Sequence, residues 1–157
     1  MPASHNSFMQ CAIELSMQNV LEGGGPFGAV VVKNGIIIAE GVNRVTRDND
    51  PTAHAEIVVI RHACNQVGSF QLTGCTVYSS CEPCPMCLGA LYWARVDTVY
   101  FANTKQDAAA IDFDDSFIYT QISLPTHTRS IPFIHLDVPQ ARKAFVLWKN
   151  KIDKICY

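Results

Sequence analysis

The stretches DPTAHAEIVVI, residues 50–60, and SCEPCPMCLGA, residues 80–90, each place metal-binding side chains at the start of an apolar run. These side chains lie two apart in the first stretch and three apart in the second: His54 and Glu56, then Cys84 and Cys87. Side chains so close in sequence can act together only if the local backbone turns them the same way. The backbone that follows each group therefore decides what the groups can do.

Both stretches are expected to begin helices. In the first, apolar side chains recur at helical spacing, at Ile57, Ile60, Cys64 and Val67. Residues 50–52 offer capping oxygens and a first-turn proline, so this helix is predicted to open at His54. In the second stretch, Pro83 predicts the start of a helix that runs to about Trp93.

Strand patterns surround these helices. Residues 27–41, FGAVVVKNGIIIAEG, join two β-branched runs through Asn34-Gly35, the pair that best fits a type I′ turn, and so predict a hairpin. Residues 75–80 and 96–102 predict two further strands, and residues 7–21 predict an amphipathic helix. The alternation of helix and strand indicates a layered α/β fold in which part of the sheet is parallel.

The C-terminal part has weaker patterns. Residues 103–130 indicate only a short helix around 108–111, and residues 131–138, IPFIHLDV, are typical of a final strand. Residues 139–155 carry one apolar stripe and predict a closing helix, with Lys and Arg mainly on a solvated face. Because no linker interrupts the chain, we expect a single domain over residues 1–157.

Composition favours an ordinary globular protein. The chain has 157 residues, 48% hydrophobic and 17% charged, and no apolar run approaches the roughly 18 residues of a membrane span. The N-terminus lacks a secretory or transit pattern, and the seven cysteines are odd in number and mostly isolated. We expect a cytoplasmic protein with reduced thiols and no membrane partner. The net charge of −2 makes a nucleic-acid partner unexpected.

The residue types in the two helix starts indicate a metal site. Two thiolates from Cys84 and Cys87 with the imidazole of His54 suit zinc. Three protein ligands leave the fourth tetrahedral position to water, which is the arrangement of a catalytic site. Glu56 is poorly placed as a ligand, so we expect it to move protons between that water and a leaving group.

Other interpretations of these cysteines stay open. Cys81 is a possible fourth ligand, which would close the site and make it a structural zinc module without catalysis. A lone C-x-x-C pair is also found in redox centres and in plain packing. Glu56 favours the catalytic interpretation, since a structural site has no use for it.

The two stretches together resemble the zinc-dependent nucleobase deaminases. His54-Ala55-Glu56 with Pro83-Cys84-Pro85-Met86-Cys87 matches their H-x-E and P-C-x-x-C signature. Over essentially the whole chain the sequence is similar to the bacterial guanine deaminases, on these segments: GGPFGAV, the Asn43 region, DPTAHAE, SCEPCPMCLGA, YWAR, FDDSFIY and a terminal Tyr.

That resemblance implies a fold, a cofactor and a reaction. The fold is the cytidine-deaminase-like three-layer α/β/α arrangement around a central five-stranded mixed sheet. The cofactor is one catalytic zinc ion held by His54, Cys84 and Cys87, with Glu56 as the proton shuttle. The reaction is the hydrolysis of guanine to xanthine and ammonia, a step of purine catabolism. Because related families share both halves of the zinc site, guanosine, cytosine and tRNA adenosine remain alternative substrates.

Several residues outside the metal set are candidates for binding the purine base. Asp115 in FDDSFIY is similar to the pocket acid of the guanine-deaminating branch; its carboxylate is suited to the amidine edge of guanine and to assisting Glu56, and the alternative is a loop cap. Asn43 can donate and accept at a purine, or simply end a strand. Phe27 can stack on the base or belong to the core.

Three further residues are candidates for binding the substrate. Ala55 lies between the expected ligand and the proton shuttle, and Trp93 and the terminal Tyr157 are aromatic candidates for the pocket wall. We expect a homodimer, in which the C-terminal helix at about 139–155 is exchanged between subunits because a long segment precedes it.

Overall fold

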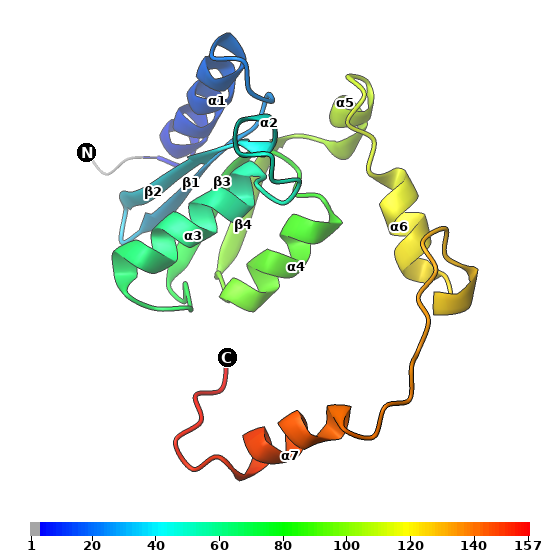
Figure 1. The fold of residues 1–157 in the computed structure, drawn as a ribbon. Helices are drawn as coiled ribbons and strands as arrows, with labels where there is room; N and C mark the ends of the chain where they lie inside the picture. The colour runs from blue at the N-terminus through cyan, green and yellow to red at the C-terminus, as the bar shows by residue number, and fades with distance from the viewer. Residues whose placement is uncertain (1–3) are drawn as a thin grey trace. The chain divides into compact units, whose positions relative to one another are not determined.

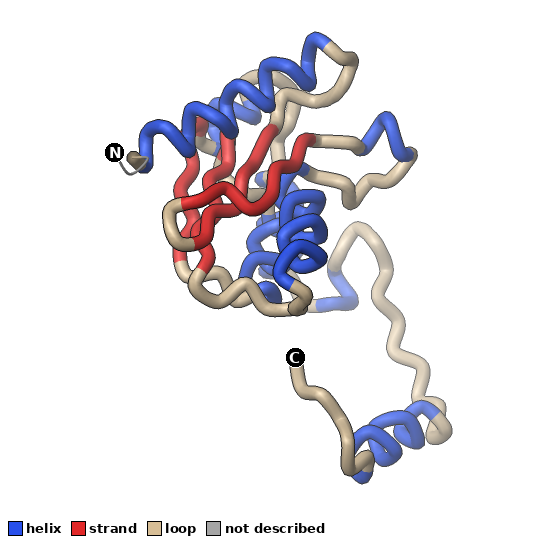
Figure 2. Tube along the Cα trace, turned by 90° about the vertical axis from the view of Figure 1, so that its left-hand side faces the viewer, coloured by secondary structure: helices blue, strands red, loops and turns tan. Residues whose placement is uncertain are grey.

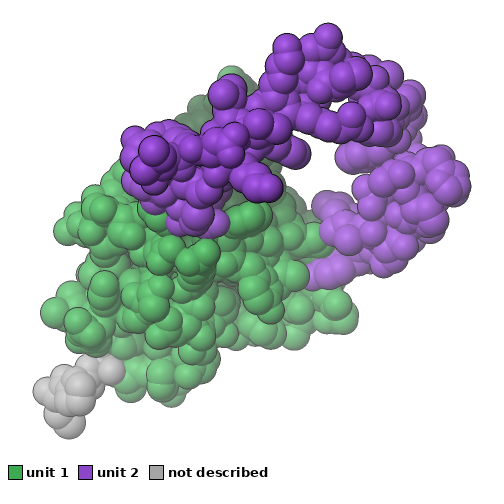
Figure 3. All heavy atoms as spheres, turned by 90° about the horizontal axis from the view of Figure 1, so that it is seen from below, with its two compact units in different colours: residues 1–115 green, residues 116–157 purple. Residues whose placement is uncertain are grey.

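The computed structural model describes residues 4–157 as two compact units (Figure 3). The first unit ends at Asp115, and the C-terminal unit comprises Ser116–Tyr157. None of the helices in residues 4–157 combines the length and the apolarity that a bilayer crossing requires.

The first unit is built on a four-stranded mixed sheet (Figure 2). Its strands are β1 Gly28–Lys33, β2 Ile36–Val42, β3 Cys75–Cys81 and β4 Thr98–Asn103, in the spatial order β2-β1-β3-β4. β1 is antiparallel to both of its neighbours, whereas β3 and β4 are parallel. The expected mixed sheet, with one parallel pair, is therefore confirmed.

Helices cover both faces of this sheet and give three layers (Figure 1). α1 His5–Leu21 packs on one face, where Phe8 and Ala12 meet Val30 and Tyr78. On the other face, α3 Ala55–Val67 and α4 Pro85–Ala94 share an apolar core with β1 and β3. Two short helices, α2 Val45–Asp48 and α5 Lys105–Ala109, lie in the loops after β2 and β4.

The local patterns explain most of these elements. Asn34 and Gly35 have φ values of 52° and 76°, as the two central residues of a type I′ turn require, so the predicted hairpin is confirmed. Two helix starts differ slightly from expectation. His54 is the N-cap of α3, and the other helix begins at Pro85 instead of Pro83. The Asp50 carboxylate accepts bonds from the Thr52 amide and hydroxyl in a local turn and so does not cap the helix.

The C-terminal unit departs most from the sequence-based expectations. It contains α6 Ser116–Ser123, a 3₁₀ turn at Thr126–Thr128 and α7 Ala141–Asn150, which is shorter than the helix expected at about 139–155. Residues 131–138 form no strand, so the described sheet has four strands and the prediction of five is wrong. A strand requires a hydrogen-bonding neighbour as well as an apolar pattern, and residues 131–138 pair with no strand of the described chain.

Close packing of β2 against α3 depends on Gly41. A Cβ atom at this position would lie 2.7 Å from both Ala55 O and Val59 N, two backbone atoms that cannot move aside locally. Gly41→Ala is therefore expected to lower the free energy of unfolding by about 1–3 kcal/mol. Urea unfolding at one fixed protein concentration measures this change.

Gly89 in α4 provides a matched control. A Cβ atom there meets nothing within 4 Å, and alanine is favoured over glycine in a helix by about 1 kcal/mol. Gly89→Ala should thus leave the protein as stable as the parent or more so. Equal unfolding midpoints for the Gly41 and Gly89 variants would contradict the close-packing explanation.

Candidate metal centre

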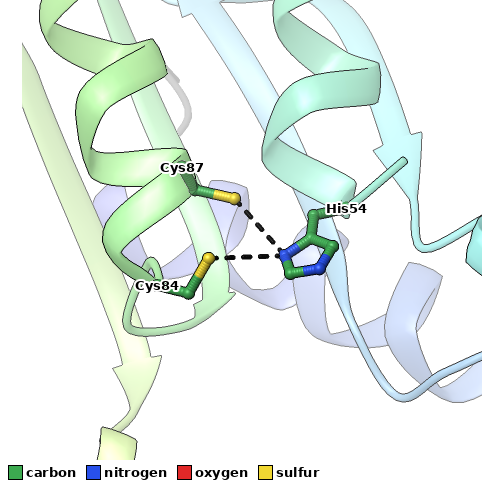
Figure 4. A group of neighbouring side chains, drawn as sticks. All are labelled: His54, Cys84 and Cys87. Carbon is green, nitrogen blue, oxygen red and sulfur yellow. Dashed lines mark hydrogen bonds between the residues drawn. The ribbon is translucent and has the colours of Figure 1, made fainter. Parts of the chain in front are cut away.

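Two helix N-termini bring three potential metal ligands together (Figure 4). His54 is the N-cap of α3 and Cys84 the N-cap of α4, both with extended backbone, while Cys87 lies in the first turn of α4. Figure 4 shows both sulfurs facing the same ring nitrogen of the histidine. The positive ends of two helix dipoles therefore lie next to the sulfurs, where they stabilise thiolates.

The spacing of the three donor atoms fits a tetrahedral zinc ion. His54 Nδ1 lies 3.5 Å from the Sγ atoms of both Cys84 and Cys87, and all three donors lie within 4.8 Å of one another. Zinc bonds of about 2.3 Å to sulfur and 2.0–2.1 Å to nitrogen, at tetrahedral angles, separate nitrogen from sulfur by about 3.6 Å. The observed separations agree with that edge length.

The electrostatics of the cluster favour thiolate at one sulfur. A hydrogen bond from the Cys87 thiol, together with the contact to His54, lowers the pKa of Cys84 to about 4. The same sharing of a proton raises the pKa of Cys87, and its burial adds to this effect. The Cys84 sulfur in turn raises the pKa of His54. One sulfur is thus an anion at neutral pH, as a metal ligand must be.

Glu56 lies beside the cluster without belonging to the donor set. Glu56 is 5% exposed, and its Oε2 is 3.5 Å from Cys87 Sγ. Burial raises the pKa of its carboxyl. A carboxyl group that is withdrawn from water and faces a metal ligand is well placed to exchange protons with a small molecule bound at the metal.

Cys81 is not part of the cluster. It is buried, and its thiol faces the Thr104 carbonyl oxygen at 3.8 Å. Burial and the nearby Glu56 carboxylate raise the pKa of Cys81 to about 11, so this residue is a neutral thiol at pH 7. Cys81→Ala is therefore expected to keep one zinc ion per chain, as measured by metal analysis of the dialysed protein.

Cys84→Ala is the matched comparison and should lose the metal, because it removes one of the three clustered donors. If Cys81→Ala also lost zinc, a closed four-ligand site would be the correct description. X-ray absorption spectroscopy of the parent protein gives an independent count of sulfur ligands.

Asn43 follows β2 and is tied to the segment that precedes the histidine ligand. The next amide, Arg44 N–H, donates to the Ala53 carbonyl at 2.9 Å, directly before His54. Asn43 is 9% exposed, and its side-chain Oδ1 accepts a hydrogen bond from Val45 N–H. Asn43 thus lies next to the segment that leads into His54.

Asp115 is the last residue of the first unit and lies within electrostatic reach of the cluster. It is half-buried, and desolvation together with the Cys84 thiolate raises the pKa of its carboxyl. Just upstream, the Phe113 ring makes an edge-on contact with Phe27, with ring centroids 4.9 Å apart. Phe27 also packs against the core, so the aromatic pair links the start of β1 to the loop that carries Asp115.

The other substrate candidates have different surroundings. Ala55 is fully buried as the first residue of α3, where a helix leaves the backbone N–H without an internal partner. Trp93 is exposed six residues beyond Cys87, about 9 Å further along α4, so the structure does not bring it to the cluster. Tyr157 belongs to the C-terminal unit, and its role stays a prediction.

Two buried polar residues near the site carried no motif that pointed to them. Ser79 on β3 donates a hydrogen bond to Glu56. Asn19 on α1 donates from Nδ2 to the carbonyl oxygens of Gly25 and Asn43, while its buried Oδ1 has no hydrogen-bond partner. For Ser79, the available signal was a polar residue on the same strand face as Cys75 and Val77, whereas no pattern indicated that Asn19 is buried.

Comparison with known proteins agrees with this geometry. Residues 2–103 match the model of the cytidine and deoxycytidylate deaminase zinc-binding region. Guanine deaminase of Bacillus subtilis (strain 168) is 51% identical over 152 residues, which are 96% of this chain and 97% of that protein. An X-ray structure of B. subtilis guanine deaminase superposes with a TM-score of 0.97 and covers 99% of each chain.

More distant relatives share the same core. A solved structure of guanine deaminase from Nitrosomonas europaea has a TM-score of 0.70 at 34% identity and covers 72% of this chain and 66% of that chain. A tRNA-specific adenosine deaminase from Agrobacterium fabrum (strain C58 / ATCC 33970) is 37% identical over 110 residues, which are 70% of this chain and 72% of that protein.

Proposed function

Because this chain belongs to the cytidine and deoxycytidylate deaminase family, we propose that it is a zinc-dependent hydrolase that converts guanine and water to xanthine and ammonia. The observation that carries the proposal is the placement of a buried carboxyl, Glu56, beside three donor atoms whose separations fit zinc. The close relationship to guanine deaminase of B. subtilis supports the choice of substrate.

His54, Cys84 and Cys87 are the residues that hold the metal in this proposal. Zinc, when bound, lowers the pKa of water to about 7 and so makes a nucleophile available at neutral pH. Glu56 takes the first proton from this water and gives it to the ring nitrogen next to carbon 2 as the water oxygen adds to that carbon. It then carries the remaining water proton to the amino group, which leaves as ammonia.

Polar groups around the metal cluster are proposed to recognise the purine base through hydrogen bonds. Asp115 accepts hydrogen bonds from the N–H and amino groups of guanine's amidine edge and assists the departure of ammonia. Asn43 binds the purine through its side-chain amide, and the Ala55 backbone N–H supplies a donor at the start of α3. The charge effect of Cys84 on Asp115 supports this placement.

Aromatic residues are proposed to close the pocket around the base. Phe27 supports one wall by holding the Asp115 loop through Phe113, in line with their edge-on contact. Tyr157 is proposed to cover the base and to exclude a ribose, which favours the free base over the nucleoside. Trp93 is not assigned to the pocket wall, because of its position on α4.

A substrate panel tests the proposed function. Ammonia release is measured from guanine, guanosine, cytosine, cytidine and adenine with the zinc-loaded protein. We expect guanine to be preferred by about 100-fold or more, because a site built around polar contacts rejects bases that leave those contacts unpaired. Inactivity on guanine, or faster turnover of any other member, would contradict the proposal.

Small free bases fit the chain better than tRNA does. The net charge is −2, whereas binding of a phosphate backbone depends on clustered Lys and Arg.

We also propose that the enzyme is cytoplasmic, which is supported by its seven free cysteines.

We propose further that the enzyme is a homodimer in which the C-terminal unit completes a second copy. That unit, taken alone, has no buried residue, although it carries many large apolar side chains, among them Phe117, Ile134, Leu136, Phe145 and Leu147. A segment without a core of its own requires another surface to cover it. In this proposal, a second copy of the chain supplies that surface.

Mixed dimers test the exchange. Tyr157→Ala is first shown to lower activity alone. It is then mixed, by co-expression, with Glu56→Gln, which keeps Tyr157. If the tail is exchanged, random mixing restores about a quarter of the parental rate, because half of the dimers are mixed and each has one intact site. A mixture no more active than its components, or a monomer in sedimentation at micromolar concentration, would contradict the exchange.

A further inference from the structure

A residue outside the proposed metal and substrate sets makes direct contact with Glu56. Ser79 lies on β3 and is 1% exposed, and its hydroxyl donates a hydrogen bond of 2.8 Å to Glu56 Oε1. The bond joins the sheet to the first turn of α3, and both partners are withdrawn from water. Loss of the hydroxyl would leave a buried carboxyl short of one partner and free to turn.

The direction of Ser79 follows from the alternation of side chains along β3. Val77 lies in the core beneath α3, and Tyr78 lies in the cluster beneath α1. Ser79 therefore shares the α3 face with Val77. Ser80, which is also 1% exposed, faces the other way and accepts a hydrogen bond of 3.0 Å from Gly28 N–H. Two adjacent buried serines thus have separate partners.

The two oxygens of Glu56 have different neighbours. Oε1 receives the Ser79 hydroxyl, whereas Oε2 lies 3.5 Å from Cys87 Sγ. A cysteine that binds zinc is a thiolate and has no proton to donate. In the metal-bound enzyme, Ser79 is therefore the side-chain donor to this carboxyl among the described residues.

We propose that Ser79 is a positioning residue, whose hydroxyl holds Glu56 Oε1 and so directs Oε2 at the reacting atoms. This inference rests on the proposed deaminase function, because it gives Glu56 the role of proton shuttle. A hydroxyl can donate to a carboxylate or rotate and accept from a carboxylic acid. Ser79 can therefore hold one oxygen of Glu56 while protons pass through the other.

Three substitutions at one position test this role. In Ser79→Ala, kcat is expected to fall about 10- to 100-fold while KM stays within about threefold, because the proton shuttle is misplaced after the substrate has bound. Zinc content should stay close to that of the parent, whereas Tm is expected to fall, because the buried Glu56 carboxyl loses one hydrogen-bond partner. Ser79→Thr keeps the hydroxyl and should recover most of kcat. Ser79→Val has the shape of threonine without the hydroxyl and should resemble Ser79→Ala.

Ser80→Ala is the matched control, since Ser80 is the neighbouring serine and is equally buried. It removes the acceptor for Gly28 N–H, so it is expected to lower Tm. Because this hydroxyl does not contact Glu56, kcat should stay within about threefold of the parent. Comparison of Ser79→Ala with Ser80→Ala separates the general effect of losing a buried hydroxyl from the effect of losing the hydroxyl that holds Glu56.

Full kcat in a zinc-loaded Ser79→Ala protein would overturn the inference, as would a kcat loss equal to that of Ser80→Ala. If the alanine variant does not fold, the threonine and valine variants decide. Equal kcat values in Ser79→Thr and Ser79→Val overturn the inference, and a higher kcat in Ser79→Thr than in Ser79→Val supports it. Failure of the proposed function is recognised separately, because the parent protein would then release no ammonia from guanine.

Discussion

Glu56→Gln is expected to keep the zinc ion and to lose ammonia release from guanine almost completely. Glutamine has the size of glutamate, and its side-chain oxygen still accepts the hydrogen bond that Ser79 donates to Oε1. Glu56 also lies outside the clustered donor set, so the metal site is undisturbed. An amide, however, cannot take up and release protons, and loss of a general acid–base group costs about 10²–10⁴-fold in rate.

Two measurements accompany the kinetic assay of this variant. Metal analysis should give one zinc per chain, and the thermal unfolding midpoint should stay near that of the parent. Turnover above about a tenth of the parental rate, well outside the range for loss of a proton shuttle, would remove Glu56 from that role. Loss of zinc would instead make Glu56 part of the metal site.

Asp115→Ala and Asp115→Asn are expected to give the second-largest loss, about 100-fold or more in kcat/KM for guanine, with zinc retained. A carboxylate offers acceptors to both donors of the amidine edge, whereas an asparagine opposes one of them with its own N–H₂ group. Each hydrogen bond to a charged group contributes about 1.5–3 kcal/mol, so loss of two accounts for such a change. The alanine variant removes both acceptors.

Asp114 provides the control for this prediction, because it precedes Asp115 and is exposed. Asp114→Asn should leave kcat/KM within about threefold of the parent. Similar kinetics for the variants at both positions would show that the acidic pair only shapes its loop.

Local sequence predicted the metal cluster well because each half of it is local. His54 and Cys84 are both N-caps, and Cys87 lies in the first turn after Cys84, so a few residues determine how each group points. The hairpin was predictable for the same reason, since Asn34-Gly35 determines its own turn.

Features that depend on distant partners were not predictable from local patterns. Residues 131–138 have the composition of a strand, but no strand of the described chain pairs with them. In α7 the apolar stripe continues to Ile152 and Ile155, yet the helix ends at Asn150 and both side chains are exposed. An apolar pattern indicates which face of a helix or strand packs against another surface, but it does not identify that surface.

Residues that act through others were missed because local sequence does not identify their partners. Ser79 occupies an ordinary strand position, and its importance comes from the carboxyl on the opposing helix. Phe113 opens the quoted segment FDDSFIY, but nothing in that segment indicated that its ring contacts Phe27. Such pairings arise from tertiary structure and not from spacing along the chain.

The apolar core beneath α3 and α4 has a consequence for metal exchange. Its buried residues come from the sheet, from both helices and from the preceding loop, and none of the three donor side chains belongs to it. Small zinc domains unfold under chelators because the ion replaces a core. Here, treatment with a chelator should yield a folded apoprotein that regains activity when zinc is returned, and that accepts cobalt as a spectroscopic substitute.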